Sequence, residues 1–224
     1  MSKYNVPQEI KLISSQYAVK AHLYSLFTGI LYLIGGVIEN RFRKKVFKNC
    51  LPKKGNEKVL DICCANGKGT LVLAGEFPNG QIDGLDINPS MIFFANHRVK
   101  NSPFVNFHVG NCAEIPFPDN NYNVINAWLA LHEIPSSLLN SVIRETKRVL
   151  KKNGYLLIFD LTLPVKPSFS MRLIYYIFRL FEDESAAKFM MVDQGALLER
   201  FGFKLIKKWK VLMGFANVLL LTKK

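Results

Sequence analysis

The sequence predicts an α/β fold in which a mostly parallel sheet of seven strands carries helices on both faces. Between Lys58 and Leu163, short apolar runs alternate with segments of helical pattern, a spacing typical of parallel strands joined by helices. The last two apolar runs, 203–213 and 216–224, are separated by only Gly214 and Phe215. Such a short connection favours an antiparallel hairpin at the edge of the sheet.

Each predicted element has its own local signal. Pro89 suits the first turn of a helix, and the predicted helix at 137–152 has a basic last turn that complements its dipole before Gly154 ends it. In chain order the strands are expected at 58–62, 81–87, 105–110, 122–130 and 155–163, followed by the hairpin, and the helices at 69–77, 90–99, 137–152 and 195–203.

Two segments lie outside this alternating pattern. Residues 1–50 contain no strong strand signal and are expected to form an N-terminal helical cap, with Pro52 and Gly55 marking the boundary to a domain at 51–224. An insertion at about 164–190 carries a second aromatic and basic helical segment. Both segments are expected to cover one end of the sheet.

The stretch 21–38 has no Lys, Arg, Asp or Glu, and at a rise of about 1.5 Å per residue it would nearly cross a hydrocarbon core. His22 and the pair Gly35-Gly36 weaken that interpretation, and the basic run 41–45 follows directly. We expect a helix that lies over the domain and rests on a membrane surface. The N-terminus lacks a signal-peptide pattern, which favours a cytoplasmic protein.

Charge and cysteine content narrow the function classes. The 224 residues carry a net charge of +13, which favours an anionic partner: nucleic acid, an acidic membrane surface or an anionic substrate. The four cysteines show no CxxC spacing, so we expect no metal site. Cys63 and Cys64 are adjacent, which suits a disulfide between them poorly, so we expect reduced thiols in a reducing compartment.

The chemistry is expected beyond the carboxyl ends of the strands, where ligands bind in open parallel sheets. Asp61 lies at the end of the first strand, and the chain then runs into five small residues, 63–67, without the GxGxxG of a dinucleotide loop, which disfavours a nicotinamide oxidoreductase. The second strand ends at Asp86, nineteen positions after Gly67. An acid there can hold both hydroxyls of a ribose.

The later strand ends complete a nucleoside pocket. Asn111, after the third strand, can pair with the edge of an adenine, and Ile87 and Met91 can lie against its faces. His132 and Glu133 follow the fourth strand.

The order of these motifs resembles the class I S-adenosylmethionine-dependent methyltransferases. That family shows DxGCGxGxxT, an acid ending the second strand, and GDAxxLPFxDxxFD; this chain has DICCANGKGT, Asp86 and GNCAEIPFPDNNYN. Its YAVKAHLY, 17–24, is similar to the family's YDxxAxxYD. Cys63 and Ala65 stand where the family has glycines, and Asn111 where it has an acid. All three are small or keep hydrogen-bonding groups, so cofactor binding is expected to survive.

The resemblance implies a Rossmann-like fold and S-adenosylmethionine as cofactor, with S-adenosylhomocysteine as product. It also implies cofactor-binding roles for Tyr17, Tyr24, Asp61, Cys63, Ala65, Gly67, Asp86, Ile87, Met91, Asn111, Cys112 and the backbone carbonyl of Ala127.

Methyl transfer needs a base only if the acceptor must lose a proton, and His132 is the best-placed candidate because its pKa lies near neutrality. It is equally a loop histidine that shapes the pocket. Glu133, Asp160 and His22 are weaker candidates.

The apolar, aromatic and basic character of 23–38 and 169–181 favours a lipophilic acceptor taken from an anionic membrane surface, either a quinone precursor or a lipid. The motifs look most like the branch with ubiquinone and menaquinone methyltransferases. The same segments also fit a lid over any small acceptor, or a contact between copies of the chain in an oligomer.

Two alternatives remain. A nucleic-acid methyltransferase would explain the charge, but no NPPY-like tetrapeptide follows the fourth strand. A non-catalytic nucleoside-binding or membrane-interaction module would bind the cofactor without turnover.

Overall fold

The computed structural model describes residues 39–51, 55–99, 102–163, 172, 175–176 and 184–224. Residues 40–224 make one compact unit. The segment 21–38, Tyr17, Tyr24 and most of the predicted helix at 171–181 lie outside the described residues. The proposed division of the chain at residue 50 therefore stays a prediction.

The described chain contains a seven-stranded sheet in the order β3-β2-β1-β4-β5-β7-β6, which confirms the predicted fold class. Strands β1 to β5 pair in parallel, and β7 runs antiparallel to both β5 and β6. The strands are β1 (Lys58–Ile62), β2 (Gln81–Asp86), β3 (Val105–Val109), β4 (Tyr122–Trp128), β5 (Leu150–Leu161), β6 (Phe203–Val211) and β7 (Ala216–Lys223).

The predicted antiparallel hairpin at the edge of the sheet is confirmed. Strand β7 inserts between β5 and β6, so β6 is the edge strand. A short 3₁₀ turn, η2 (Leu212–Gly214), connects them. Strand β7 is buried along most of its length, whereas β6 is buried only at Phe203 and is otherwise half-buried or exposed, with Lys204, Lys207, Lys208 and Lys210 on the outside. Lysines on an edge strand oppose pairing with another chain.

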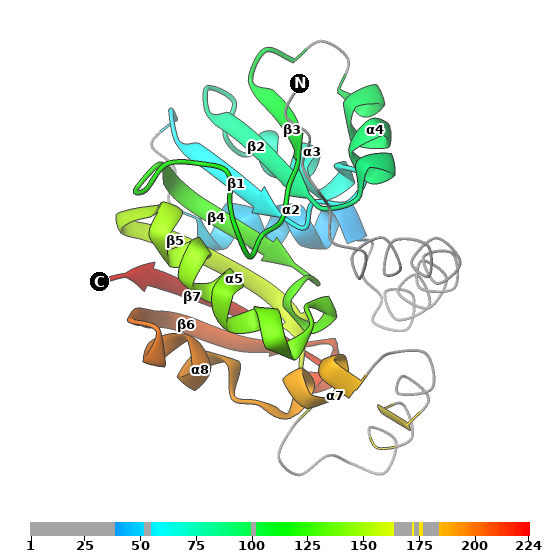
Figure 1. Ribbon diagram of the computed structural model, residues 1–224, viewed down its shortest axis with the longest axis vertical. Coiled ribbons are helices and arrows are strands. Elements are labelled where there is room, and N and C mark those ends of the chain that lie inside the picture. The colour runs from blue at the N-terminus through cyan, green and yellow to red at the C-terminus, as the bar shows by residue number, and fades with distance from the viewer. Residues whose placement is uncertain (1–38, 52–54, 100–101, 164–171, 173–174, 177–183) are drawn as a thin grey trace. The chain divides into compact units, whose positions relative to one another are not determined.

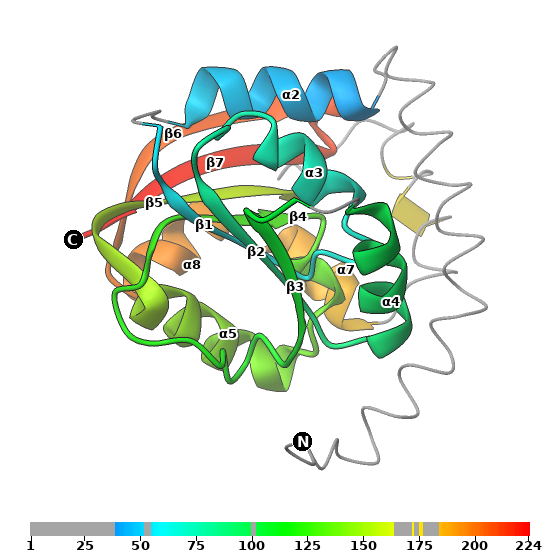
Figure 2. The ribbon, with the colours of Figure 1, turned by 90° about the horizontal axis from the view of Figure 1, so that it is seen from above.

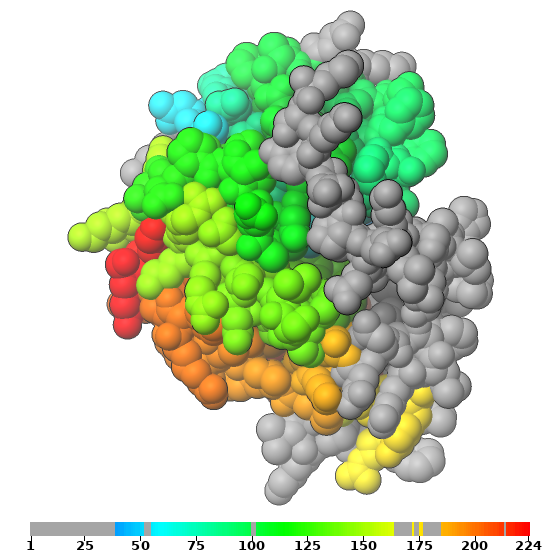
Figure 3. All heavy atoms as spheres, in the orientation of Figure 1, coloured from blue at the N-terminus to red at the C-terminus, as the bar shows by residue number. Residues whose placement is uncertain are grey.

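Helices cover both faces of the sheet (Figures 1 and 2). Helices α2 and α3 lie on one face, and α5 and α8 lie on the other, where they form much of the surface seen in Figure 3. The α-helices of the described chain are α2 (Glu39–Cys50), α3 (Lys68–Ala74), α4 (Pro89–Arg98), α5 (Ser136–Val149), α7 (Glu184–Met191) and α8 (Gln194–Arg200).

The predicted end of the helix at 137–152 is wrong. Helix α5 ends at Val149, and β5 begins at Leu150, which pairs with Tyr122 of β4. Leu150 is fully buried, Asn153 has a positive φ of 61°, and Lys151 Nζ donates to Asn123. Pairing with β4 and burial of Leu150 therefore override the local helical pattern.

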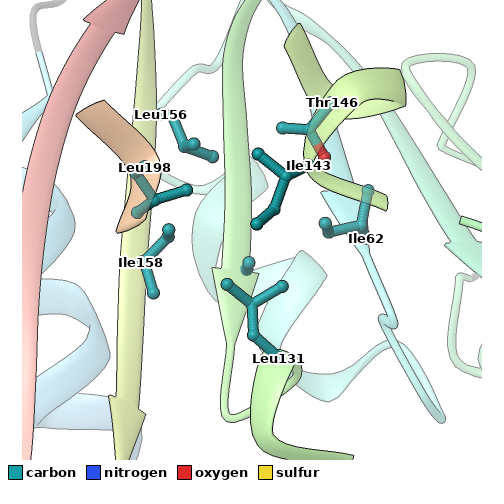
Figure 4. A pocket seen from close by; sticks show the side chains of 8 residues that line it. Ile62, Leu131, Ile143, Thr146, Leu156, Ile158 and Leu198 are labelled. Carbon is teal, nitrogen blue, oxygen red and sulfur yellow. The ribbon is translucent and has the colours of Figure 1, made fainter. Parts of the chain in front are cut away.

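The core between the sheet and helices α5 and α8 is closely packed. A void of about 10 Å³ lies among side chains of β1, β4, β5, α5 and α8, including Ile62, Ile143 and Leu198 (Figure 4). Its lining is apolar except for Thr146, and such a volume holds a single water at most. It is a packing void and offers no ligand site.

The ring of Phe107 on β3 packs against two glycines on neighbouring elements. A Cβ at Gly84 of β2 would lie 2.5 Å from the ring, and a Cβ at Gly67, in the turn after β1, would lie 2.5 Å from it and 2.9 Å from Ala95 of α4. Real Cβ atoms do not come this close. The two glycines therefore let β3 hold the β1–α3 turn in place.

No helix within the described part of the chain combines the length and the apolar character needed to cross a membrane. The interpretation of 21–38 as a surface helix concerns residues outside that part.

Gly67→Ala tests the fit around Phe107. Gly67 has a φ of +73°, so a Cβ costs backbone energy in addition to the clash. We expect the free energy of unfolding in urea to fall by about 2–4 kcal/mol. Gly75→Ala is the matched control, because Gly75 has a φ of −61° and room for a Cβ, and it should change stability by less than about 0.5 kcal/mol. Equal effects would contradict this account.

Asp83 of β2 is the centre of a buried polar cluster. Its carboxylate accepts a hydrogen bond from the Tyr122 hydroxyl at 2.9 Å and pairs with His108 Nε2 at 3.1 Å. Burial acts to raise the pKa of Asp83, but the hydrogen bonds from His108 and Tyr122 outweigh it, and the pKa is lowered. The cluster therefore joins β2, β3 and β4 through their side chains.

Asp83→Asn should lower stability by about 1–3 kcal/mol at neutral pH. Because the folded pKa of Asp83 lies below its unfolded value near 3.8, its contribution is present above that value and is lost as the pH falls through the folded pKa. Urea unfolding of both proteins between neutral pH and pH about 3 should show the difference shrinking at the acid end. Asp119→Asn, an exposed carboxylate, controls for the change of charge; a pH-independent difference at Asp83 would refute the assignment.

Candidate functional site

The strands that should carry the site end next to one another. Ile62, the last residue of β1, is in register with Leu85 of β2 and with Ala127 of β4, and Asp86 is in register with Val109 of β3. The turns that follow these strands therefore meet at one edge of the sheet (Figure 1). The order of the strands reverses between β1 and β4, which is where open α/β sheets bind ligands.

Asp61 is held inside the protein at the end of β1. Its Oδ2 accepts from the Thr70 hydroxyl at 2.6 Å and its Oδ1 accepts from Asn126 Nδ2 at 2.7 Å. Burial raises the pKa of the carboxyl, while the hydrogen bonds from Thr70 and Asn126 oppose that shift. Asp61 is only 3% exposed, so its principal contacts are with α3 and β4. Its predicted contact with a cofactor stays a prediction.

In the turn between β1 and α3, every second residue has a left-handed backbone conformation. Cys63, Ala65 and Gly67 have positive φ values of 53°, 47° and 73°, and these are the three positions where the resembling family carries glycine. Left-handed backbone costs a residue with a Cβ about 1–2 kcal/mol. Cys63 and Ala65 therefore keep the glycine conformation in spite of that cost, which indicates that the shape of the turn is retained for a purpose.

Asp86 ties this turn to the end of β2. Its Oδ2 accepts from the Ala65 N–H at 2.8 Å and its Oδ1 accepts from the Asn88 N–H at 2.9 Å. Burial raises the pKa of Asp86, and the backbone hydrogen bonds oppose that shift. Each carboxylate oxygen has a second lone pair, so Asp86 retains the capacity to accept from two hydroxyl groups.

The loop after β3 brings Asn111 and Cys112 to the same edge. The Gly110 N–H donates to the Asp86 carbonyl at 2.9 Å, which joins this loop to the end of β2. Asn111 Oδ1 accepts from the Ala113 N–H at 2.9 Å, so the amide Nδ2 is the group it can offer to an adenine. Cys112 Sγ lies 3.7 Å from Cys63 Sγ.

The remaining predicted cofactor residues differ in exposure. Ile87 is 38% exposed at the end of β2, and Met91 is half-buried in the first turns of α4. Ala127 is fully buried, and its side chain lines the void between the sheet and α5. The carbonyl contact that the resemblance implies for Ala127 stays a prediction. Tyr17, Tyr24 and His22 lie outside the described residues.

His132 and Asp160 form a buried pair. His132, in the 3₁₀ turn η1 (Leu131–Glu133), lies with Nδ1 2.5 Å from Asp160 Oδ1 at the end of β5. Both side chains are 0% exposed. Asp160 also accepts from the N–H groups of Leu131 and Leu161, at 2.8 and 2.7 Å, which fixes its carboxylate as an acceptor. Asp160 therefore orients His132. The sequence alone had allowed Asp160 as an alternative base, acting on its own.

The second half of the motif after β3 is structural. Arg148 of α5 donates to the carbonyls of Ile115 and Phe117 and pairs with Asp119, and Glu145 accepts from the Ile115 N–H. These contacts fix the IPFPD segment against α5. The segment positions Asn111 and Cys112 by anchoring the chain that follows them.

Sequence reasoning missed Asn126 and Thr70, the two partners of Asp61. A polar Asn inside the apolar run of β4 was the available signal, since a buried amide needs a partner. It also missed the pairing of His132 with Asp160, which are 28 residues apart and are joined only by the packing of β4 against β5.

The residues that meet at this edge of the sheet suit a ligand in which a nucleoside is joined to a small polar group. Asp86 can accept from two hydroxyls, the small side chains of the β1 turn leave the backbone approachable, and Ile87 offers an apolar surface. Nothing in the turn resembles the glycine-rich cradle of a phosphate.

Comparisons with known proteins show which family the chain belongs to. Residues 59–154 match the family model described as "Methyltransferase domain". An uncharacterised methyltransferase of Synechocystis sp. is 32% identical over 187 residues, which cover 83% of this chain and 84% of the relative. A demethylmenaquinone methyltransferase of Listeria welshimeri is 33% identical over 130 residues, 57% of this chain and 54% of the relative, so the chain spans about half the length of that relative.

Among solved structures, the chain is similar to a phosphoethanolamine N-methyltransferase of Haemonchus contortus in complex with S-adenosyl-L-methionine. The TM-score is 0.65 at 17% identity, covering 82% of this chain and 52% of the other. At this identity the likeness shows the fold alone. The Synechocystis relative, matched over most of its length, shows the family. The chain belongs to the class I S-adenosylmethionine-dependent methyltransferases.

Proposed function

We propose that this enzyme transfers a methyl group from S-adenosylmethionine to a small lipophilic acceptor, of which a reduced quinone precursor is the first class to test. The observation that carries the proposal is the position of the His132–Asp160 pair. It lies after β4 and β5, next to the strand ends that carry the proposed cofactor residues, and this position supports a role for His132 as a proton acceptor near the methyl donor.

The residues at the strand ends fit the cofactor. Asp86 would hold the ribose hydroxyls, Asn111 Nδ2 would pair with the adenine, and Ile87 and Met91 would lie against its faces. The turn from Cys63 to Gly67 and the backbone of Ala127 would hold the methionine part, with Asp61 keeping the turn in shape. When bound, S-adenosylmethionine supplies an activated methyl group on a sulfonium sulfur. The protein then has to align the acceptor and keep water out.

Asp86→Asn tests the ribose assignment. Removing the charge weakens hydrogen bonds to two hydroxyls, each worth about 1.5–3 kcal/mol when one partner is charged. We expect calorimetric titration with S-adenosylhomocysteine to show affinity at least about tenfold lower. Glu199→Gln, an exposed carboxylate on α8, is the matched control and should bind like the unchanged protein, since α8 carries none of the proposed cofactor residues.

Circular dichroism must show that Asp86→Asn is folded, because Asp86 also holds the Ala65 N–H. Undiminished affinity in a folded variant would rule out the ribose contact. Binding of S-adenosylhomocysteine without turnover on any acceptor would favour the non-catalytic module instead.

The acceptor class is supported by the relatives and by charge. The Listeria relative is a demethylmenaquinone methyltransferase, and it is 33% identical to this chain over 130 residues. Helix α2 exposes Arg41, Lys44, Lys45 and Lys48, a basic surface suited to the anionic headgroups of a membrane that holds a lipophilic acceptor. Together these features support a quinone precursor more than a nucleic acid.

His132 is proposed as the base that takes a proton from the acceptor. A hydroquinone becomes a stronger nucleophile when its hydroxyl loses a proton, and the Asp160 carboxylate at Nδ1 would stabilise the imidazolium that forms when the ring takes that proton. Glu133 lies at 4.0 Å from Nε2 and is 25% exposed. His132 is fully buried, so the proposal requires the acceptor to displace the side chains that cover the ring.

His132→Gln should lower kcat about 10²–10⁴-fold while S-adenosylhomocysteine affinity stays unchanged. Asp160→Asn should lower kcat as well, because it disturbs the orientation of the ring. The measurement is transfer of labelled methyl from S-adenosylmethionine to a reduced, short-chain prenylated naphthoquinone. His97→Gln, an exposed histidine on α4, is the control.

A purely structural His132 gives a different pattern. His132→Gln would then lower the free energy of unfolding, and the protein that remains folded would turn over at the ordinary rate. That result would remove the base from the proposal.

A further inference from the structure

Two thiols face each other across the candidate cofactor site. Cys63 belongs to the turn after β1 and Cys112 to the loop after β3, and their sulfur atoms are 3.7 Å apart. Strand β2 lies between β1 and β3 in the sheet. The pair therefore spans the end of β2, where Asp86 holds the Ala65 N–H and where the ribose is proposed to lie.

We propose that Cys63 and Cys112 form an oxidisable dithiol, and that its disulfide closes the cofactor site. The oxidant in this reaction is a peroxide. The inference rests on the proposed cofactor position, since the consequence for binding follows only if the cofactor occupies the end of β2.

The surroundings of the pair favour this reaction. Both side chains are half-buried, so a small oxidant can reach them. The hydrogen bond from the Cys63 thiol lowers the pKa of Cys112, which makes Cys112 the first thiolate. The nearby charge of Asp86 acts to raise the pKa of both thiols, so the hydrogen bond between them is what selects Cys112.

The other two cysteines are poorer candidates. Cys64 directs its sulfur toward the Ala65 carbonyl, at 3.8 Å, and burial raises its pKa well above the ordinary value. Cys50 is buried in α2, and burial raises its pKa too. Thiolate formation and access therefore both favour Cys112, and the nearby Cys63 is the thiol that can resolve its oxidised form.

The reaction balances with peroxide as the oxidant. The Cys112 thiolate attacks one peroxide oxygen, the O–O bond breaks, and sulfenic acid and hydroxide form. Cys63 sulfur then attacks the sulfenic sulfur, the S–O bond breaks, and hydroxide leaves and takes up the Cys63 proton as water. Overall, two thiols and one hydrogen peroxide give one disulfide and two water molecules.

The disulfide should exclude the cofactor, and the cofactor should protect the thiols. Bringing the two sulfur atoms from 3.7 Å to bonding distance draws the β1 turn and the β3 loop together over Asp86. By linkage, a ligand that binds only the reduced form stabilises the dithiol relative to the disulfide by the same coupling free energy. A bound ligand at the end of β2 would also hinder access of the oxidant to the two thiols. The left-handed backbone at Cys63 keeps the thiol in place for this step.

The experiment treats the reduced full-length chain with hydrogen peroxide. Peptide mass mapping should find a Cys63–Cys112 link, and thiol titration should show two thiols lost. Calorimetric affinity for S-adenosylhomocysteine should fall at least about tenfold and return after dithiothreitol. Added S-adenosylhomocysteine should slow the loss of thiols.

Each variant is compared with itself before and after peroxide, so any change in its starting affinity cancels. Cys112→Ser and Cys63→Ser should lose the peroxide effect on affinity, and Cys50→Ala should keep it. A link between other cysteines, no link at all, or a Cys63–Cys112 link with unchanged affinity would overturn the proposal. A reduced protein that fails to bind S-adenosylhomocysteine would overturn the proposed function as well, and mass mapping still reports the link separately.

Discussion

The geometry of the candidate site depends on the buried carboxylate of Asp61. One oxygen holds Thr70 at the start of α3 and the other holds Asn126 on β4, so a single side chain fixes the end of β1 to elements on two sides. A buried carboxylate is costly unless donors satisfy it, and here each oxygen has one. Between these anchors the chain has few residues in which to turn, and this constraint selects the alternating left-handed backbone from Cys63 to Gly67.

The same turn explains how the chain departs from the glycines of its family without changing shape. Cys63 and Ala65 adopt conformations that favour glycine, and Asp86 stabilises the result through the Ala65 N–H. Asp86 thus contributes to the turn and, in the proposed function, to the ribose. Placing a cysteine at residue 63 also brings a thiol toward Cys112, so a substitution that conserves backbone shape introduces a new chemical capacity.

Membership of the family establishes the methyl donor, whereas the acceptor depends on features that the fold does not specify. Many activities share this sheet, and the parts that differ among them lie in the segments around the strand ends. In this chain the described part of that region contains His132 held by Asp160, the pair to which the proposed function assigns proton transfer. The basic surface of α2 adds a reason to look for the acceptor at a membrane.

The sequence alone determined where the strands and helices alternate along the chain and to which family the chain belongs. It also singled out Asp61, Gly67 and Asp86 as candidate site residues. These follow from local periodicity and from motifs within about 30 residues, where neighbours in sequence are neighbours in space. Only the tertiary structure decided that β7 lies between β5 and β6, that α5 ends at Val149, that Asp61 faces Asn126, and that His132 meets Asp160. Each of these depends on residues far apart in the chain, brought together by strand pairing and burial, and local pattern carries no information about such partners.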